Sequence, residues 1–331
     1  MKNPLLILYL FISVWGCETS FETEAAEKEI PVVYGILNIN EAKQYIRIER
    51  AFLSNGKNVF ELAKDPEMLY YKSGKAFLSV PGSGKLIEGK KINADDIGYI
   101  REDGIFAKSP NILYEFSTND WKANPPSKVV FTFDSPSLPD QVTSEVSVLK
   151  ELQLREGVPS IPLNLGYDRV VTIGWNNSAE AKVFDLKMRI NFQEKNNQTN
   201  GLFINKTLDW VLKNNIEVGS DPLKGNFSFK GIDFFKYLAN SLSNSPNIQR
   251  YMISVDLVLT AGGNEFKEIL NLNQANFGLT SSNNIPRYNN IVNGTGFLSS
   301  RIQILRPDIS LSSGTLDSLK NGIYTKTLQF K

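Results

Sequence analysis

The acidic pairs Asp95-Asp96 and Glu102-Asp103 are the residues of this sequence whose types and spacing come nearest to a chemical site. Paired carboxylates can supply oxygen ligands to a hard cation, or share general acid–base work when a cleft holds them together. No calcium-loop spacing surrounds either pair, and both lie in short polar segments typical of turns. We therefore predict turns at both pairs rather than a metal site or a catalytic site.

The amino-acid composition excludes several common kinds of catalytic and metal site. The chain has no histidine and one cysteine, which removes Ser-His-Asp and Cys-His nucleophiles, histidine-ligated metals, disulfides and cysteine-ligated zinc. With 36 basic and 35 acidic residues the formal net charge is +1, so no field that attracts nucleic acid is expected. We predict a protein without catalytic residues, metal or cofactor, and without a nucleic-acid partner.

The segment from Gly84 to Lys91 nearly fits the phosphate-binding pattern Gly-x4-Gly-Lys-Ser/Thr. Lys91 stands where a hydroxyl residue would bind Mg²⁺, and no helical pattern follows to bring an N-terminus to the phosphate. We interpret this segment as a basic hairpin punctuated by glycine.

Aromatic residues in the first half of the chain offer a second kind of site. Five of them could form an exposed platform that stacks on a glycan or a peptide: Tyr70, Tyr71, Tyr99, Tyr114 and Trp121. In a β-rich domain such side chains mostly fill the core and cross-strand pairs, which is the reading we favour. Trp121 is the expected exception because charged residues flank it. The candidate ligand-binding residues are thus Trp121, Tyr70 and Tyr71.

The N-terminal segment indicates where the protein resides. Lys2 precedes an apolar run, Leu5 to Trp15, which suits a signal peptide and is too short to cross a bilayer as a helix. The run ends in Val14-Trp15-Gly16-Cys17, which resembles the lipobox of bacterial lipoproteins. We predict a signal peptide over 1–16 and lipidation at Cys17, and hence a lipid anchor.

An acidic segment follows the predicted lipid. Residues 17–29 carry five glutamates against one lysine and show no periodic apolar face, so we expect a disordered tether. Acidic residues directly after a lipidated cysteine, here Glu18, Glu22 and Glu24, resemble the signal that sends lipoproteins of Bacteroidetes-type bacteria to the cell surface. The alternative is a merely soluble spacer.

Short strands dominate the predicted first domain, 30–155. Two alternating apolar runs, 32–36 and 45–48, flank a polar turn and predict a hairpin. Further strands are predicted at 76–80, 98–101, 113–117, 128–133 and 145–149, with a short helix or loop at 65–71. This spacing favours a β-sandwich or a partly open barrel.

The predicted second domain, 160–331, begins after a segment rich in glycine and proline. A strand that ends in Trp175, followed by an alternating strand from Phe184, resembles the opening of fibronectin type III-like modules, with the tryptophan in the core. Strands are also predicted at 250–260 and 296–304, and helices at 208–214 and 233–242. Residues 308–331 are expected to add an edge strand or to cross the surface. Asparagine clusters at 196–200, 244–247, 271–276 and 283–293 predict long surface loops.

The chain as a whole resembles a family of Bacteroidetes outer-membrane lipoproteins of unknown function, encoded near TonB-dependent transporters. The resemblance rests on the lipobox, the opening 31–37 with 45–48, the segment 175–186, and the segment Asn290-Ile-x-Asn-Gly-x-Gly-Phe297. It implies a surface lipoprotein of two β domains and supplies no catalytic residues. Asn293, Gly294 and Gly296 are predicted to build a tight turn that requires positive φ.

These observations lead to one fold prediction and three hypotheses of function. The fold is all-β with minor helix: two immunoglobulin-like or fibronectin III-like sandwich domains on a lipid-anchored tether. The first hypothesis is a non-enzymatic surface protein that binds an extracellular glycan or peptide or docks on a TonB-dependent transporter. The second is a structural or adhesive envelope protein. The third, a glycan hydrolase, requires two carboxylates in one cleft, about 5–10 Å apart.

Overall fold

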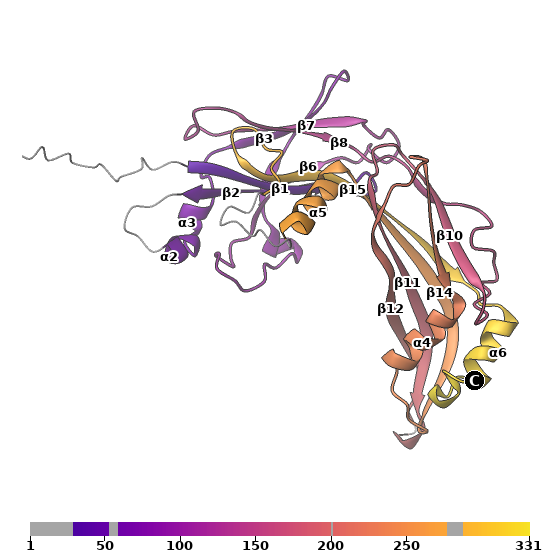
Figure 1. Ribbon diagram of the computed structural model, residues 1–331. Helices are drawn as coiled ribbons and strands as arrows, with labels where there is room; N and C mark the ends of the chain where they lie inside the picture. The colour runs from indigo at the N-terminus through magenta and orange to yellow at the C-terminus, as the bar shows by residue number, and fades with distance from the viewer. Residues whose placement is uncertain (1–28, 53–58, 200, 277–286) are drawn as a thin grey trace, which may run out of the picture.

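The computed structural model describes residues 29–52, 59–199, 201–276 and 287–331 (Figure 1). The signal peptide, Cys17 and the acidic residues Glu18, Glu22 and Glu24 lie outside the described residues. The structure is mostly β, with 47% strand and 16% helix, and its three sheets are open. The predicted β-rich class is confirmed, and the barrel alternative is wrong.

One end of the molecule, here called the N lobe, is a pair of facing sheets. Its first sheet has the order β15-β1-β2-β6-β5 and its second the order β4-β3-β7-β8. The predicted opening hairpin is confirmed, since β1 and β2 pair antiparallel around the polar turn. The strands are β1 (Glu29–Leu37), β2 (Lys43–Phe52), β3 (Lys75–Val80), β4 (Lys85–Glu88), β5 (Lys90–Asn93), β6 (Ile112–Ser117), β7 (Lys128–Asp134) and β8 (Val142–Ser147).

The core of the N lobe lies between these two sheets. Phe116 and Tyr114 of β6 are buried against the opposite sheet, and the Tyr114 and Phe133 ring centroids are 5.8 Å apart. Gly89 separates β4 from β5, which belong to different sheets, and a Cβ at Gly89 would lie 2.6 Å from the Phe116 ring. The predicted hairpin over 84–91 is therefore wrong. The hairpin formed is β3–β4, and the chain crosses between the sheets at the glycine.

The other end, the C lobe, is also built from two sheets. Its strands are β9 (Leu152–Leu154), β10 (Val170–Asn177), β11 (Val183–Asn196), β12 (Ile204–Glu217), β13 (Lys224–Lys230), β14 (Ile248–Gly262) and β15 (Thr295–Ile309). A three-stranded sheet, β13-β10-β9, faces the four strands β12-β11-β14-β15. Trp175 is fully buried with its ring centroid 5.2 Å from that of Phe184, so its predicted core position is confirmed.

Strand β15 belongs to both lobes. Its first half pairs parallel with β1, from Thr295 to Ser300, and its second half pairs antiparallel with β14, from Arg301 to Ile309. The result is one eight-stranded sheet, β12-β11-β14-β15-β1-β2-β6-β5, that runs through the molecule. Figure 1 shows the two lobes meeting at an angle along this strand. Strand pairing between β1 and β15 therefore crosses the domain boundary predicted near 155–160. The reason is that β15, from the predicted second domain, completes a sheet of the N lobe.

The helices cover sheet edges and faces. They are α2 (Val59–Ala63), α3 (Pro66–Leu69), α4 (Gly231–Ser241), α5 (Asn264–Asn276) and α6 (Ser313–Asn321), with the 3-10 turns η1 (Ala94–Ile97), η2 (Asn197–Thr199) and η3 (Lys326–Leu328). The helix predicted at 233–242 is confirmed as α4, and the short helix expected within 65–71 as α3. The asparagines of 271–276 lie in α5 rather than in a loop.

The helix predicted at 208–214 is wrong, because these residues belong to strand β12. Leu208 and Leu212 fit helical spacing, yet they also fit strand alternation once Trp210 is counted between them, and all three pack against the core. Pairing with β11 along the whole strand decides between the two readings.

Two other expectations fail for local reasons. Residues 98–101 form no strand, since Gly98 has φ of 84° and ends η1. After β15 the chain neither adds an edge strand nor runs only along the surface. It forms α6 and buries Leu319, Leu328 and Phe330 against the C lobe.

Candidate functional site

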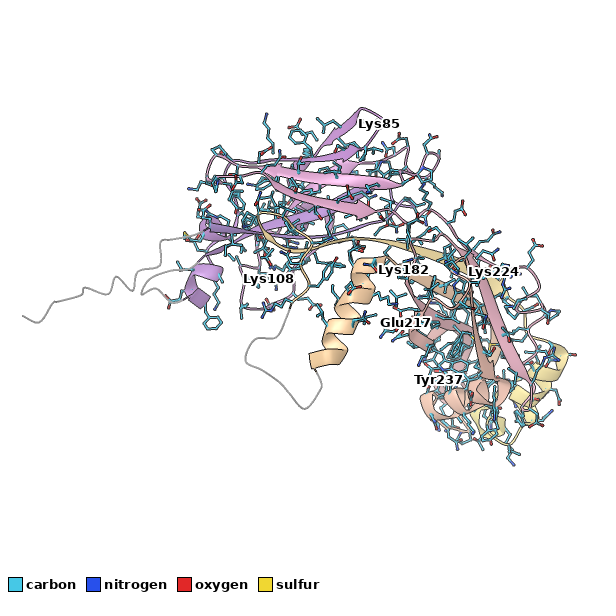
Figure 2. All side chains as sticks on the ribbon, turned by 45° about the horizontal axis from the view of Figure 1, so that its top comes forward. Lys85, Lys108, Lys182, Glu217, Lys224 and Tyr237 are labelled. Atoms are coloured by element: carbon cyan, nitrogen blue, oxygen red, sulfur yellow. The ribbon has the colours of Figure 1, made fainter. Side chains whose placement is uncertain are left out.

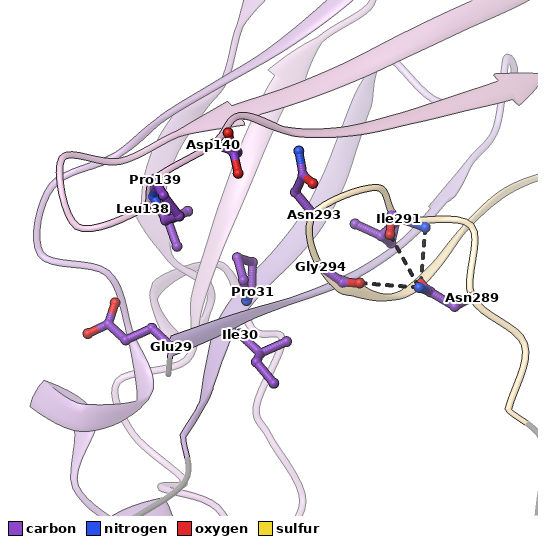
Figure 3. A pocket seen from close by; sticks show the side chains of 10 residues that line it. All are labelled: Glu29, Ile30, Pro31, Leu138, Pro139, Asp140, Asn289, Ile291, Asn293 and Gly294. Carbon is purple, nitrogen blue, oxygen red and sulfur yellow. Dashed lines mark hydrogen bonds between the residues drawn. The ribbon is translucent and has the colours of Figure 1, made fainter. Parts of the chain in front are cut away.

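A cavity of about 460 Å³ lies at the beginning of β1 (Figure 3). Three segments far apart in the sequence form it: the first residues of β1, the β7–β8 turn and the segment that leads into β15. Its lining residues are Glu29, Ile30, Pro31, Leu138, Pro139, Asp140, Asn289, Ile291, Asn293 and Gly294. The cavity thus coincides with part of the segment that carries the family resemblance.

Asn289 shapes one wall of this cavity. Its side-chain Nδ2 donates to the carbonyl oxygens of Ile291 and Gly294, both at 3.2 Å, and its Oδ1 accepts from the Ile291 N–H at 3.0 Å. An asparagine that bonds to its own backbone in this way replaces a regular turn. The wall is therefore held by the asparagine side chain, as Figure 3 shows by the dashed lines.

Asn293, Gly294 and Gly296 continue the same turn with different roles. Asn293 has φ of 59° and Gly296 has φ of 130°, and a Cβ at Gly296 would overlap the Val33 carbonyl oxygen. Gly294 has no positive φ, but a Cβ there would lie 2.8 Å from the Pro31 oxygen. Asn293 Nδ2 donates to the Gln141 carbonyl at 2.8 Å, which joins the turn to β8. The predicted positive φ is therefore confirmed at Asn293 and Gly296 and is wrong at Gly294, where a side chain is excluded by the close approach to β1.

The polar groups of the cavity are mainly acceptors. Glu29 accepts from Arg50 at 2.9 Å through Oε1, while its buried Oε2 has no hydrogen-bond partner among the described residues. Asp140 is exposed on the β7–β8 turn. Between them lie apolar walls from Ile30, Pro31 and Leu138. Such an arrangement suits a ligand that donates hydrogen bonds, for example through hydroxyl or amino groups.

The predicted ligand-binding aromatics do not present open ring faces. Trp121, Tyr70 and Tyr71 are 1%, 5% and 3% exposed. Tyr71 packs its ring edge against Phe133, with centroids 5.2 Å apart. Trp121 lines a separate cavity of about 450 Å³ beside the β3–β4 hairpin, where Lys85 pairs with Asp120. An exposed stacking platform is therefore not formed by these three residues, and the expectation that Trp121 is the exposed one is wrong.

Asp95 and Asp96 lie in the 3-10 turn η1, as predicted, whereas Glu102 and Asp103 lie in an irregular bend. Asn93 accepts from the Asp95 N–H through its side chain and begins η1, while Asp95 accepts from the Ser109 hydroxyl at 2.8 Å. Asp103 pairs with Lys108 at 2.9 Å on the surface. Across the described ranges, no group of three or more acidic or cysteine side chains is arranged to hold a metal ion.

An apolar surface on the outer side of β1 was not foreseen. Tyr34 and Ile36 point away from the core and are 51% and 38% exposed. We call the outer surface formed by Tyr34, Ile36, Tyr45, Phe297 and the loop residues 97–106 the β1 face. A signal for it exists in the sequence: residues 31–37 are apolar at every position, as in strands covered on both sides.

Comparison with models of known protein families and with curated proteins finds no match to this chain. None of the helices in the described ranges is long and apolar enough to cross a membrane.

Proposed function

We propose that this chain is a surface-exposed, lipid-anchored outer-membrane protein that works without catalysis. It binds an extracellular ligand at the cavity beside β1, or serves as an accessory component of a TonB-dependent transporter. The observation that carries this proposal is the position of the cavity at Glu29, where the described fold begins directly after the predicted tether.

The length of the predicted tether supports a position of the cavity near the membrane. From Cys17 to Glu29 the chain advances 12 residues (29 − 17), which span at most about 40 Å when extended. A lipid at Cys17 therefore keeps this end of the N lobe within reach of proteins embedded in the same membrane. A ligand captured there is within reach of such a protein as well.

We further propose that each lobe is a β-sandwich and that the C lobe is fibronectin III-like. In support, a three-stranded sheet faces four strands, and chain order runs β9, β10, β11, β12, β13, β14, β15 through them. The buried Trp175 between the sheets agrees with that reading. These modules commonly present binding surfaces on a rigid frame.

The geometry of the carboxylates favours binding over hydrolysis. A glycoside hydrolase needs one carboxyl kept protonated and a second one across the scissile bond. In the cavity, Glu29 is paired with Arg50 and Asp140 is exposed, so neither lies in the apolar setting of a general acid. A purely structural or adhesive role remains the second candidate, favoured by the continuous sheet that joins the lobes.

The test is affinity isolation of the native, lipidated protein from gently solubilised outer membranes. We expect a stoichiometric TonB-dependent transporter, and no turnover of glycans or peptides by the purified protein. Asp140→Lys should weaken binding of glycan or peptide ligands found in a screen, whereas Asp168→Lys, an exposed aspartate of the C lobe, should leave it unchanged. Recovery of the protein alone, without ligand in the screen, would favour the structural role.

A further inference from the structure

We propose that the β1 face is a docking surface for the extracellular part of an integral protein of the same membrane. This inference rests on the proposed lipid anchor, and it assigns a surface and a partner chemistry that the cavity does not provide. The observation behind it is that β1, a central strand of its sheet, exposes the large apolar side chains of Tyr34 and Ile36.

The centre of the face is a row of side chains across three strands. Phe297 of β15, Tyr34 of β1 and Arg47 of β2 are register neighbours and lie on the same side of the sheet. Ile36 and Tyr45 belong to the next row along β1 and β2. Tyr34 and Ile36 are 51% and 38% exposed, so a partner that covers this row would remove apolar surface from water.

The loop 97–106 extends the face beyond β2. Tyr99 packs its ring edge on Tyr45, with centroids 5.6 Å apart, and its carbonyl accepts from Asn111 Nδ2 at 2.6 Å. The loop is thereby fixed to the sheet while Tyr99, Ile100 and Phe106 stay 58%, 70% and 41% exposed. Figure 2 places the adjoining Lys108 on the side of the N lobe opposite Lys85 of the β3–β4 hairpin.

An ion-paired centre lies among these apolar groups. Glu49, only 6% exposed, accepts from Arg47 at 3.0 Å and from Arg101 at 2.8 Å. Arg101 also lies over the Phe106 ring at 5.0 Å, while Glu102 and Asp103 of the same loop are exposed, so the face carries both signs of charge. Aromatic and arginine side chains together are the residues that dominate binding energy at protein interfaces. The complementary partner presents apolar side chains with charged groups of both signs between them.

The anchor limits where this partner can be. Tyr34 lies five residues beyond Glu29 along β1, about 17 Å at the rise of a strand. Added to the tether, this keeps the face within about 60 Å of the lipid. Direct insertion into lipid is disfavoured, since Tyr34, Arg47 and Arg101 carry hydrogen-bonding groups that hydrocarbon cannot satisfy. A protein surface can satisfy them.

The C lobe provides a matched control surface. Val211 of β12 and Leu305 of β15 are 51% and 53% exposed on the outer side of the sheet, which makes them comparable with Tyr34. Lys187 is the register neighbour of Val211, and it pairs with Asp209. On the other side of Lys187 stand Val258 and then Leu305, so the Lys187–Asp209 pair interrupts the apolar row between Val211 and Leu305.

The experiment uses the full lipidated chain in its own membrane, with a photo-cross-linking phenylalanine analogue at position 34 or, as a control, at position 211. We expect a cross-link from position 34 to an integral outer-membrane protein and none from position 211. The double variant Tyr34→Glu/Ile36→Asp should lower recovery of that protein at least tenfold. Val211→Asp/Leu305→Asp should leave its recovery unchanged, and urea midpoints should show that both variants fold.

Three results would overturn the docking surface: cross-links from position 34 only to lipid or to a second copy, no cross-link at all, or equal loss in both double variants. Membrane fractionation of the same cells distinguishes failure of the docking proposal from failure of the proposed function. If the chain is in the outer membrane but gives no such cross-link, the docking surface is refuted and the proposed anchor is supported. A chain absent from the outer membrane contradicts both.

Discussion

Tyr34 of β1 and Phe297 of β15 are direct neighbours in the parallel pairing of the two strands, although they come from opposite ends of the described chain. Phe297 is held in turn by the ring edge of Phe266 from α5, with centroids 5.1 Å apart. The last strand of the sequence therefore completes the sheet that carries both the cavity and the β1 face. We therefore expect both proposed kinds of binding to require this pairing.

Gly296→Ala should break the pairing of β15 with β1. The backbone there has φ of 130°, and a Cβ would overlap the Val33 carbonyl, so we expect a loss of roughly 3 kcal/mol in the free energy of unfolding. Gly314→Ala in α6 is the matched control, because a Cβ there meets nothing within 4 Å and alanine favours a helix. Equal urea midpoints for the two variants would contradict this account of the pairing.

Arg250→Met should destabilise the C lobe strongly. Arg250 is 1% exposed, and it donates to Glu194 at 2.9 Å and to the Leu328 carbonyl at 2.7 Å. Removing it leaves a half-buried carboxylate with one fewer partner, at a cost of about 3–5 kcal/mol. Chemical denaturation measures the loss, and a change below about 1 kcal/mol would show that the buried arginine is not needed to fix the C-terminal segment.

Acid should weaken the same region. Burial alone would raise the pKa of Glu194, but Lys206 and Arg250 outweigh it and lower the pKa below its ordinary value. The folded state thus binds this proton less well than the unfolded state does. The stabilisation is present above the ordinary carboxyl pKa, about 4, and is lost as pH falls through the lowered value.

Urea midpoints between pH 6 and pH 3 test this, with Glu194→Gln as the comparison. The variant should be less stable at pH 6 and should lose less stability on acidification. The same pH dependence in both proteins would show that Glu194 does not contribute to it.

Much of the strand content is predictable from local patterns. Alternation of apolar and polar residues locates β11 and β14, and the Trp175 context locates β10, because each has one face on the core. The left-handed backbone at Asn293 is also predictable, because asparagine tolerates that conformation, whereas the role of Gly294 in the close approach to β1 is not.

The remaining features of the fold depend on contacts with residues far away in the sequence, which local patterns do not reveal. Leu208 and Leu212 satisfy both helix and strand periods, and only pairing with β11 makes them strand. Trp121 lies between charged residues, yet the N lobe buries it. The use of β15 by both lobes, and therefore the cavity at Glu29, arises from a parallel pairing between the two ends of the described chain.

Tyr237→Phe should weaken the contact between α4 and β12, the edge strand of the long sheet. The Tyr237 hydroxyl donates to the Asp209 carbonyl at 2.7 Å, while its ring stacks on Trp210 with centroids 5.3 Å apart (α4 and Tyr237 are visible in Figure 2). Phenylalanine keeps the stacking and removes the hydrogen bond, so we expect a loss of about 1 kcal/mol. Tyr251→Phe, whose hydroxyl meets only Gln249 at the surface, should change the midpoint much less. The reverse order of the two effects would contradict the role assigned to Tyr237.

The measurement that tests the central claim most directly is the location of the wild-type protein and of Cys17→Ser in cells. It combines fatty-acid labelling, membrane fractionation and protease treatment of intact cells. The account predicts that the wild-type chain incorporates label, fractionates with the outer membrane and is cleaved from outside. Cys17→Ser should lose the label and leave the membrane. An unlabelled wild-type chain, or a variant that keeps the same surface location, would contradict a lipid-anchored surface protein.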